Sequence, residues 1–116
     1  MQSEDLYEKL IDFLEKEEPY LDPEITLKSL ASQLHLSPHQ LSQVINENSD
    51  FNFSNLINHY RVKKFKVLIT ERSYKNHTLL SIALQSGFNN KNSFNQAFKK
   101  ETGTTPSQYR KSLSPK

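Results

Sequence analysis

The sequence predicts an all-α fold, because one helical pattern occurs twice and no segment shows the alternation of a β-strand. The first copy covers residues 26–48 and the second covers residues 78–102. In each copy a threonine is followed five residues later by an alanine, Ala31 or Ala83, and then by a turn and a second apolar-patterned segment. A small residue at a helix crossing, a tight turn and a second helix make up a helix-turn-helix. Two such subdomains are therefore expected.

Hydrophobic spacing and capping residues predict about seven helices along the chain. The first has an apolar stripe that includes Leu10 and Leu14, and Pro19 ends it. The fourth is the longest and joins the two helix-turn-helix subdomains. Its inward face is expected to hold Phe53, Leu56, Ile57, Tyr60, Leu68 and Ile69, with Arg61, Lys63, Lys64 and Lys66 mostly outward. The helices are expected at residues 3–18, 27–34, 38–48, 54–71, 79–86, 91–101 and 107–113.

Turn residues separate these helices. His35 and Gly87 occupy the two helix-turn-helix turns, where a positive φ is expected, and His tolerates that conformation less well than Gly. Ser37 and Pro38 suit the N-cap and first position of a helix. Gly103 is expected to cap the C-terminus of the sixth helix.

The expected domain organisation follows the helices. The segments are an acidic N-terminal helix and connector (1–25), the first helix-turn-helix (26–52), a linker helix (53–72), the second helix-turn-helix with a terminal helix (73–113) and a frayed tail (114–116). A linker helix of about 18 residues is roughly 27 Å long. With the offset to each recognition helix, this length predicts a separation of about 34 Å, one turn of DNA. One chain would then fit two successive major-groove segments without a dimer.

Charge is distributed unevenly along the chain. Residues 1–25 hold nine acidic and two basic residues, a net −7, whereas residues 26–116 hold 13 basic and four acidic residues, a net +9. A basic segment that contains the repeated pattern is typical of a nucleic-acid binder. The acidic N-terminal segment is expected to point away from DNA or to cover the basic face when DNA is absent. Acidic residues at a helix start also suit the helix dipole.

Other functional classes lack support in the sequence. The chain has no Cys, no Gly-rich phosphate loop and no nucleophile motif. His35 and His39 are separated by the predicted turn, and His59 and His77 lack nearby ligand-type residues. No apolar run approaches the roughly 20 residues of a membrane span, and no signal peptide is visible. We therefore expect neither an enzyme nor a metal or cofactor site, and we expect a cytoplasmic location without membrane contact.

Residues 82–110 contain an ordered series of apolar, glycine and basic positions. The series is Ile82-Ala83, Gly87-Phe88, Phe94, Phe98-Lys99-Lys100, Thr102-Gly103, Pro106 and Tyr109-Arg110. In order and spacing it resembles the signature of the AraC/XylS family of transcription regulators. The resemblance covers about residues 20–112 and includes Tyr60-Arg61. It implies seven helices in two helix-turn-helix subdomains and sequence-specific binding of double-stranded DNA upstream of promoters in bacteria.

The resemblance also implies partners. RNA polymerase is a candidate partner, as is an upstream sensing or dimerisation domain, which most relatives carry and which nothing in this sequence resembles. The chain is expected to be either a short stand-alone member or the DNA-binding part of a longer regulator, and its abrupt start favours the latter. The sequence departs from the family where many relatives have Arg and this chain has Gln43 and Gln96. Since Gln pairs with adenine, a site richer in A·T is expected.

The polar faces of the two recognition helices supply the candidate DNA contacts. Candidate base contacts are His39, Gln40, Ser42, Gln43 and Asn46 in the first, and Lys91, Asn92, Ser93, Asn95 and Gln96 in the second. Candidate backbone contacts are Thr26, Arg61, Lys63, Thr78, Lys99, Lys100, Arg110 and Lys111. The plainer interpretation is that these are solvated polar faces, that Thr26 and Thr78 only cap helices, and that Arg61 belongs to a structural ion pair.

Two alternative functions remain open at this stage. A protein–protein interaction module that kept the fold and lost DNA binding is favoured by the two glutamines and the low net charge of +2. An RNA or single-strand binder would need exposed aromatic residues for stacking, and Phe88, Phe94 and Phe98 have the spacing for it. The same spacing is more typical of core packing.

Overall fold

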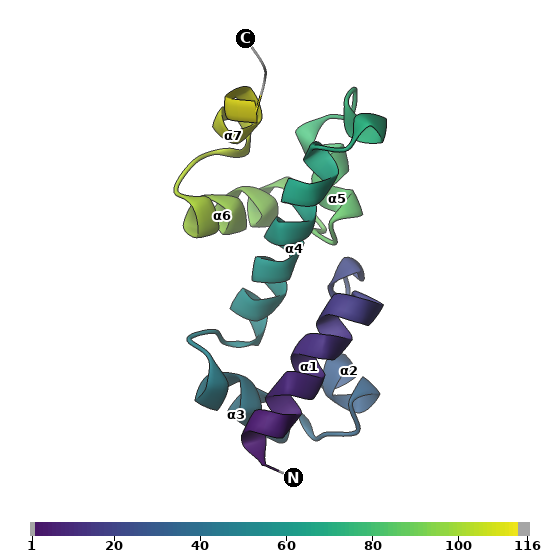
Figure 1. Cartoon of the computed structure of the whole chain (residues 1–116), viewed down its shortest axis with the longest axis vertical. Helices are drawn as coiled ribbons and strands as arrows, with labels where there is room; N and C mark the ends of the chain where they lie inside the picture. Colours follow the sequence, from purple (N-terminus) through teal and green to yellow (C-terminus); the bar gives the residue numbers. More distant parts are fainter. Residues whose placement is uncertain (1, 114–116) are drawn as a thin grey trace. The chain divides into compact units, whose positions relative to one another are not determined.

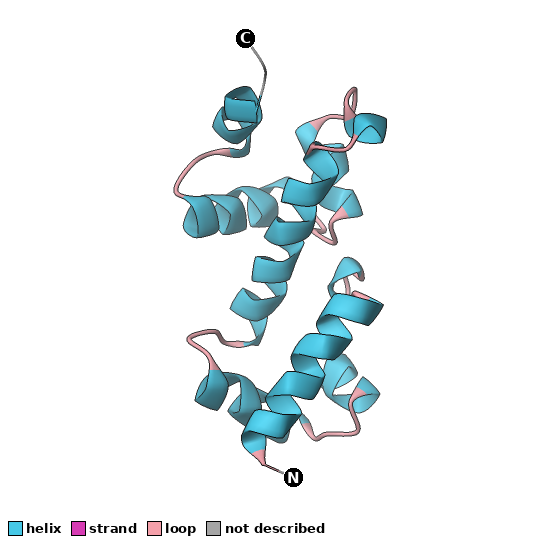
Figure 2. Ribbon diagram, viewed as in Figure 1, coloured by secondary structure: helices cyan, strands magenta, loops and turns pink. Residues whose placement is uncertain are grey.

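The computed structural model describes residues 2–113, and every regular element within them is helical (Figure 2). The all-α prediction is therefore confirmed. The α-helices are α1 (Ser3–Glu17), α2 (Leu27–Gln33), α3 (Pro38–Asn48), α4 (Phe53–Ile69), α5 (Leu79–Gln85), α6 (Lys91–Thr102) and α7 (Pro106–Leu113), with short 3-10 helices η1 (Pro19–Leu21) and η2 (Arg72–Tyr74). The predicted tail, residues 114–116, lies outside the described part of the chain.

The chain forms two compact units, which we call unit 1 (Met1–Ile57) and unit 2 (Asn58–Lys116). Unit 1 contains α1, α2 and α3, and unit 2 contains α5, α6 and α7. The long helix α4 crosses the boundary, so that its first residues belong to unit 1 and the rest to unit 2. Each unit thus holds one helix-turn-helix and a share of α4.

Unit 1 is built around α3, against which both α1 and α2 pack (Figure 1). The apolar stripe predicted for α1 is buried at Leu10 and Leu14, so this acidic helix has its apolar side in the core of unit 1. The buried residues of unit 1 are Leu10, Leu14, Tyr20, Leu30, Ala31, Leu41, Val44, Ile45, Leu56 and Ile57. The acidic helix α1 is part of unit 1 because its apolar side chains are buried against the helix-turn-helix.

Unit 2 has an aromatic core centred on Phe65 of α4. The ring of Phe65 lies 4.7 Å from that of Phe94 and 5.4 Å from that of Phe98, measured between centroids. Phe88 packs against Phe94 at 5.3 Å, and Tyr109 of α7 against Phe98 at 5.3 Å. Edge and tilted arrangements at these distances are favourable for aromatic rings. They tie α4, α6 and α7 together.

Both helix-turn-helix turns have the same backbone hydrogen bond and a positive φ at the equivalent residue. Leu36 N–H donates to Ala31 O at 2.9 Å, and Phe88 N–H donates to Ala83 O at 3.2 Å. His35 has φ 60° and Gly87 has φ 104°, so the predicted positive φ is confirmed at both positions. Both alanines are fully buried, because the two helices approach closely there. The repeated sequence pattern therefore encodes a repeated turn.

The helix ends follow the predicted caps. The Ser37 side chain accepts from Gln40 N–H at 3.1 Å, with Pro38 as the first residue of α3. In unit 2 the N-cap is Asn90, whose side chain accepts from Ser93 N–H at 2.8 Å, and this cap comes one residue later than in the first copy. Gly103 ends α6 with φ 78°. The longer second turn is thus confirmed.

The main differences from the sequence-based expectations lie in α4 and at helix ends. Val62 and Phe65 are 3% and 0% exposed, whereas the sequence pattern places neither of them on the inward face. They lie within a run of basic residues, and the stems of long basic side chains can cover an apolar surface. The first helix ends one residue earlier than expected, because Glu18 adopts φ 50°.

Candidate nucleic-acid interface

The two recognition helices, α3 and α6, are amphipathic in the same way. Each buries three apolar residues at matching positions: Leu41, Val44 and Ile45 in α3, and Phe94, Ala97 and Phe98 in α6. Each residue of the second set lies 53 positions after its counterpart in the first set. The predicted candidate base contacts therefore occupy equivalent faces of two equivalent helices.

On α3, His39, Gln40, Gln43 and Asn46 are exposed, and Ser42 is half-buried. The side-chain oxygen of Gln40 accepts from Ser37 N–H at 3.0 Å and so completes a capping box. The amide NH₂ of Gln40 still has donors for another acceptor. Four of the five candidate positions on this helix are thus accessible to a large ligand.

Gln43 belongs to a polar chain that links α3 to the start of α1. Its Nε2 donates to Glu47 Oε2 at 3.4 Å, and Ser3 Oγ donates to Glu47 Oε1 at 2.9 Å. Asn48 Nδ2 donates to Ser3 Oγ at 2.9 Å. A hydrogen-bonded amide samples fewer rotamers, so this series of hydrogen bonds favours one orientation of the Gln43 side chain.

On α6, Lys91, Asn92, Ser93 and Gln96 are exposed, whereas Asn95 is half-buried. Asn95 lies in a groove between α5, α6 and the start of α7. The groove is lined by Leu79, Leu80, Lys91, Phe94, Asn95, Lys99, Thr105, Pro106 and Ser107. Asn92 and Gln96, one turn apart on the adjacent stripe, form the more open polar edge of the helix.

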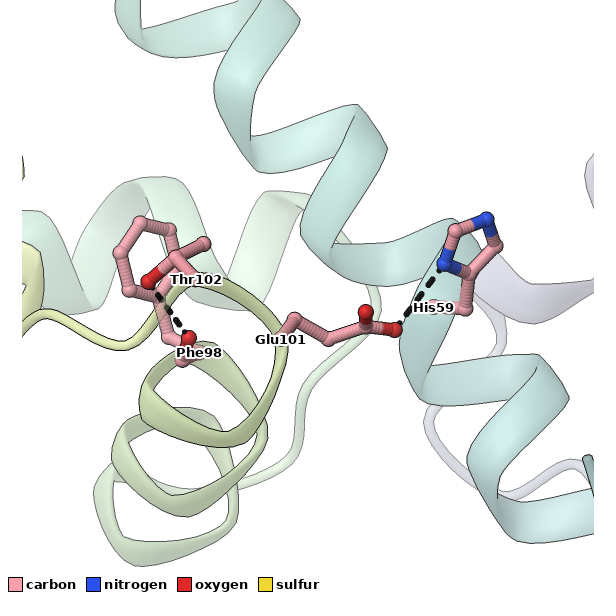
Figure 3. A network of polar contacts seen from close by, with 4 residues as sticks. All are labelled: His59, Phe98, Glu101 and Thr102. Atoms are coloured by element: carbon pink, nitrogen blue, oxygen red, sulfur yellow. Dashed lines mark hydrogen bonds and ion pairs between the residues drawn. The ribbon is translucent and has the colours of Figure 1, made fainter.

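The C-terminal end of α6 is fixed by polar contacts (Figure 3). His59 Nδ1 of α4 lies 3.0 Å from Glu101 Oε1, and the two side chains are 35% and 27% exposed. Thr102 Oγ1 donates to Phe98 O at 2.8 Å. The first contact holds the end of α6 against α4 within unit 2, and the second closes the last turn of α6 itself.

The candidate backbone contacts divide into exposed and packed side chains. Lys63, Lys99, Lys100 and Lys111 are exposed. The guanidinium of Arg61 is half-buried and lies 5.8 Å from the centroid of the Phe88 ring. A cation in this position is attracted by the ring face and also helps to cover the core.

The remaining candidate backbone contacts lie at helix starts and on α7. Thr26 Oγ1 accepts from Ser29 N–H at 3.0 Å, and Thr78 Oγ1 accepts from Ser81 N–H at 3.0 Å. Their predicted capping roles are therefore confirmed, and a hydroxyl that accepts one bond keeps its own proton to donate. Arg110 Nη2 donates to Lys75 O at 3.3 Å.

The structure adds basic residues that the repeat pattern did not single out. A groove beside η2 is lined by Ile69, Thr70, Glu71, Arg72, Lys75, Arg110 and Leu113. Lys66 Nζ lies 5.8 Å from the ring centroid of Tyr109. Arg72 and Lys75 are exposed and come from the polar connector. Only the position of α7 against that connector brings them near Arg110, so no local sequence pattern reveals the cluster.

Several other kinds of site find no support in the described residues. Phe88, Phe94 and Phe98 are at most 2% exposed, so they form core and cannot stack on bases. Within residues 2–113, no group of three or more His, Cys, Asp or Glu residues is placed to hold a metal ion. The same described range contains no helix that is both long and apolar enough to cross a membrane.

The fold and the two polar helix faces define a double helix-turn-helix domain, and comparisons with known proteins agree. The model of a helix-turn-helix domain family matches residues 30–112. An uncharacterised HTH-type transcriptional regulator of Staphylococcus aureus is 30% identical over 108 residues, which are 93% of this chain and 14% of that protein. The chain thus spans about one seventh of the length of this relative.

Two solved structures have the same fold. The C-terminal domain of the two-component response regulator yesN from Fusobacterium nucleatum is 32% identical, with a TM-score of 0.69 over 91% of this chain and 98% of that one. The DNA-binding domain of the global transcriptional factor AdpA, in complex with a target DNA, has a TM-score of 0.74 and 15% identity over 90% and 88% of the two chains. This chain belongs to the AraC-type helix-turn-helix family of bacterial transcription regulators.

Proposed function

We propose that this chain binds double-stranded DNA sequence-specifically as the DNA-binding domain of an AraC-type bacterial transcription regulator. The observation that carries the proposal is the equivalence of α3 and α6: each follows the same turn, buries three apolar residues at matching positions and leaves a polar face exposed. Asn, Gln, Ser, His and Lys on such a face supply the donors and acceptors that base edges need. The two helices enter adjacent major-groove segments.

The residues have distinct proposed roles. Gln43 and Gln96, at equivalent positions, contact adenine bases, and the other exposed members of the two base-contact sets contact neighbouring bases or the sugar–phosphate edge. Ser42 and Asn95 are half-buried at equivalent positions, so they act mainly in orienting their helices. The backbone contacts are Thr26, Arg61, Lys63, Thr78, Lys99, Lys100, Arg110 and Lys111, which fix the register of the protein on DNA.

The regulatory context is also a proposal. We place the protein in the cytoplasm, where its DNA target lies, and assign it no catalytic activity and no cofactor. Regulation follows from contact with RNA polymerase or from holding a sensing or dimerisation domain near a promoter. The second possibility is supported by the length of the Staphylococcus aureus relative, of which this chain covers 14%.

Selection from a random duplex library, followed by sequencing, tests the proposal. Enrichment of a site in two parts, about ten base pairs apart, is the expected result, because recognition helices one DNA turn apart would contact successive major-groove segments. Competition with single-stranded DNA should have little effect on binding. No enrichment, together with no salt-sensitive binding to bulk duplex, would instead indicate a protein-interaction module that kept the fold.

A further inference from the structure

The two units carry opposite net charges. Unit 1 holds three basic and 11 acidic residues, a net −8, and unit 2 holds 12 basic and two acidic residues, a net +10. Of the basic residues in unit 1, Lys9 and Lys16 lie on α1 and Lys28 lies on α2, so α3 has none. Two units of the same architecture therefore offer very different potentials to a phosphate backbone.

The difference extends to equivalent positions of the two recognition helices. Asn46 and Glu47 of α3 correspond to Lys99 and Lys100 of α6, 53 residues later, and all four are exposed. The first position of α3 is Pro38, and the first position of α6 is Lys91. At these matched positions α6 has three positive charges, whereas α3 has one negative charge.

DNA binding has two contributions, sequence-independent affinity and sequence discrimination, and different side chains provide them. Affinity for any duplex comes mainly from Lys and Arg at phosphates, which release counterions and make binding depend on salt. Discrimination among sequences comes from contacts to base edges, which neutral amides provide. For base discrimination α3 has His39, Gln40, Gln43 and Asn46, but it has no Lys or Arg to contact phosphates.

We propose that the two units divide these tasks. Unit 2 supplies most of the sequence-independent grip on phosphates through α6 and its basic surroundings, besides its own base contacts, and unit 1 adds sequence discrimination through the neutral face of α3 with little phosphate affinity of its own. The inference rests on the proposed DNA binding and specifies how the two halves share it. Changes in the bases that face α3 then lower affinity toward the value for random DNA without changing its dependence on salt, whereas loss of the basic residues of unit 2 weakens binding to every duplex.

A salt titration of the full chain on a random-sequence duplex tests the division. One variant combines Lys99→Asn with Lys100→Glu and so gives α6 the residues of α3. The matched variant is Lys28→Gln, which removes an exposed charge from α2 of unit 1. The first should lower the slope of log affinity against log salt by about 1.8, since two phosphate contacts contribute about 0.9 each. The second should leave the slope unchanged.

The outcomes separate the inference from the function on which it rests. An unchanged slope after the Lys99 and Lys100 exchange overturns the division of tasks, and so does a loss of about 0.9 from Lys28→Gln, the value for one phosphate contact, while DNA binding itself stands in both cases. Absence of salt-sensitive duplex binding by the unmodified chain overturns both proposals. Circular dichroism of each variant checks the fold, and Lys99→Gln with Lys100→Gln provides a second, milder exchange.

Discussion

The imidazole of His59 in α4 and the carboxylate of Glu101 in the last turn of α6 lie within hydrogen-bonding distance, with Nδ1 and Oε1 3.0 Å apart. Glu101 lies near a helix C-terminus, where a negative charge is disfavoured by the helix dipole. The imidazole of His59 offsets this unfavourable position and connects α6 to the long helix. The contact therefore fixes the end of the recognition helix that is farthest from its N-cap.

Loss of this contact should have a small but measurable effect on stability. In a double-mutant cycle with His59→Gln and Glu101→Gln, we expect a coupling of about 0.2–1 kcal/mol, the usual range for partly exposed pairs. Urea denaturation gives the four free energies of unfolding. The exposed Asp12–Lys16 pair on α1, at 3.0 Å, provides a reference for a simple surface pair. A coupling of zero at His59 and Glu101 would contradict a stabilising role.

The alanine at the helix crossing of unit 2 should tolerate no larger side chain. Ala83 is fully buried, and its carbonyl accepts the turn hydrogen bond from Phe88. Ala83→Leu should overpack the crossing and destabilise the protein by about 1–3 kcal/mol. The neighbouring Leu84 is 47% exposed, so Leu84→Ala should change stability by less than about 0.5 kcal/mol. Equal effects in thermal denaturation would argue against close packing at Ala83.

Gly87 should be required by its backbone conformation. At φ 104° a β-branched residue is strongly disfavoured. Gly87→Val should therefore destabilise unit 2 by about 1–3 kcal/mol and weaken DNA binding by displacing α6. Denaturation and a duplex-binding assay measure the two effects. A folded and fully active Gly87→Val protein would show that the turn does not need this conformation.

At the corresponding turn of unit 1, a substitution by glycine should not destabilise the protein. His35 has φ 60°, a conformation that disfavours residues with a Cβ by roughly 1–2 kcal/mol. Glycine removes that strain but adds roughly 0.5–1 kcal/mol of backbone entropy to the unfolded chain. His35→Gly should thus be neutral or stabilise by up to about 1 kcal/mol, measured as the midpoint shift in urea. Clear destabilisation would mean that the imidazole makes a stabilising contact.

The two equivalent glutamines should determine base preference. Gln43→Ala and Gln96→Ala should each reduce discrimination at one position of the selected site by about 1–3 kcal/mol, without changing the salt slope. Gln33→Ala and Gln85→Ala are matched controls, because both residues are exposed at the last position of α2 and α5. Repeating the library selection with each variant gives the comparison. Unchanged preferences with Gln43→Ala would exclude it from base contact.

The sequence predicts most of the fold because the determining interactions are local. Caps such as Thr26 and Ser37, and turns with positive φ at His35 and Gly87, depend on residues within a few positions of one another. The burial of Phe65 depends instead on aromatic rings of α6, about 30 residues away. Because basic residues flank Phe65 in the sequence, the local pattern does not predict that it is a central core residue.

The candidate interface is predictable to a similar degree. Amphipathicity alone separates the polar faces of α3 and α6 from their buried triples. It does not reveal that Asn95 lines a groove, that Glu47 binds both Ser3 and Gln43, or that Arg72 lies near Arg110, because these relations require packing between helices. The pairing of a side chain with a particular base depends on the DNA as well as on the protein, so the protein sequence alone does not determine it.

The sharing of α4 between the two units affects how the protein can be dissected. A fragment cut between Ile57 and Asn58 would interrupt a continuous helix at the boundary of the units. The new ends would expose backbone N–H and C=O groups that are satisfied within the intact helix, and nucleation of the shortened helix would be less favourable. Isolated halves would therefore under-report the stability of each unit, and an overlap that retains all of Phe53–Ile69 in both fragments is the sounder design.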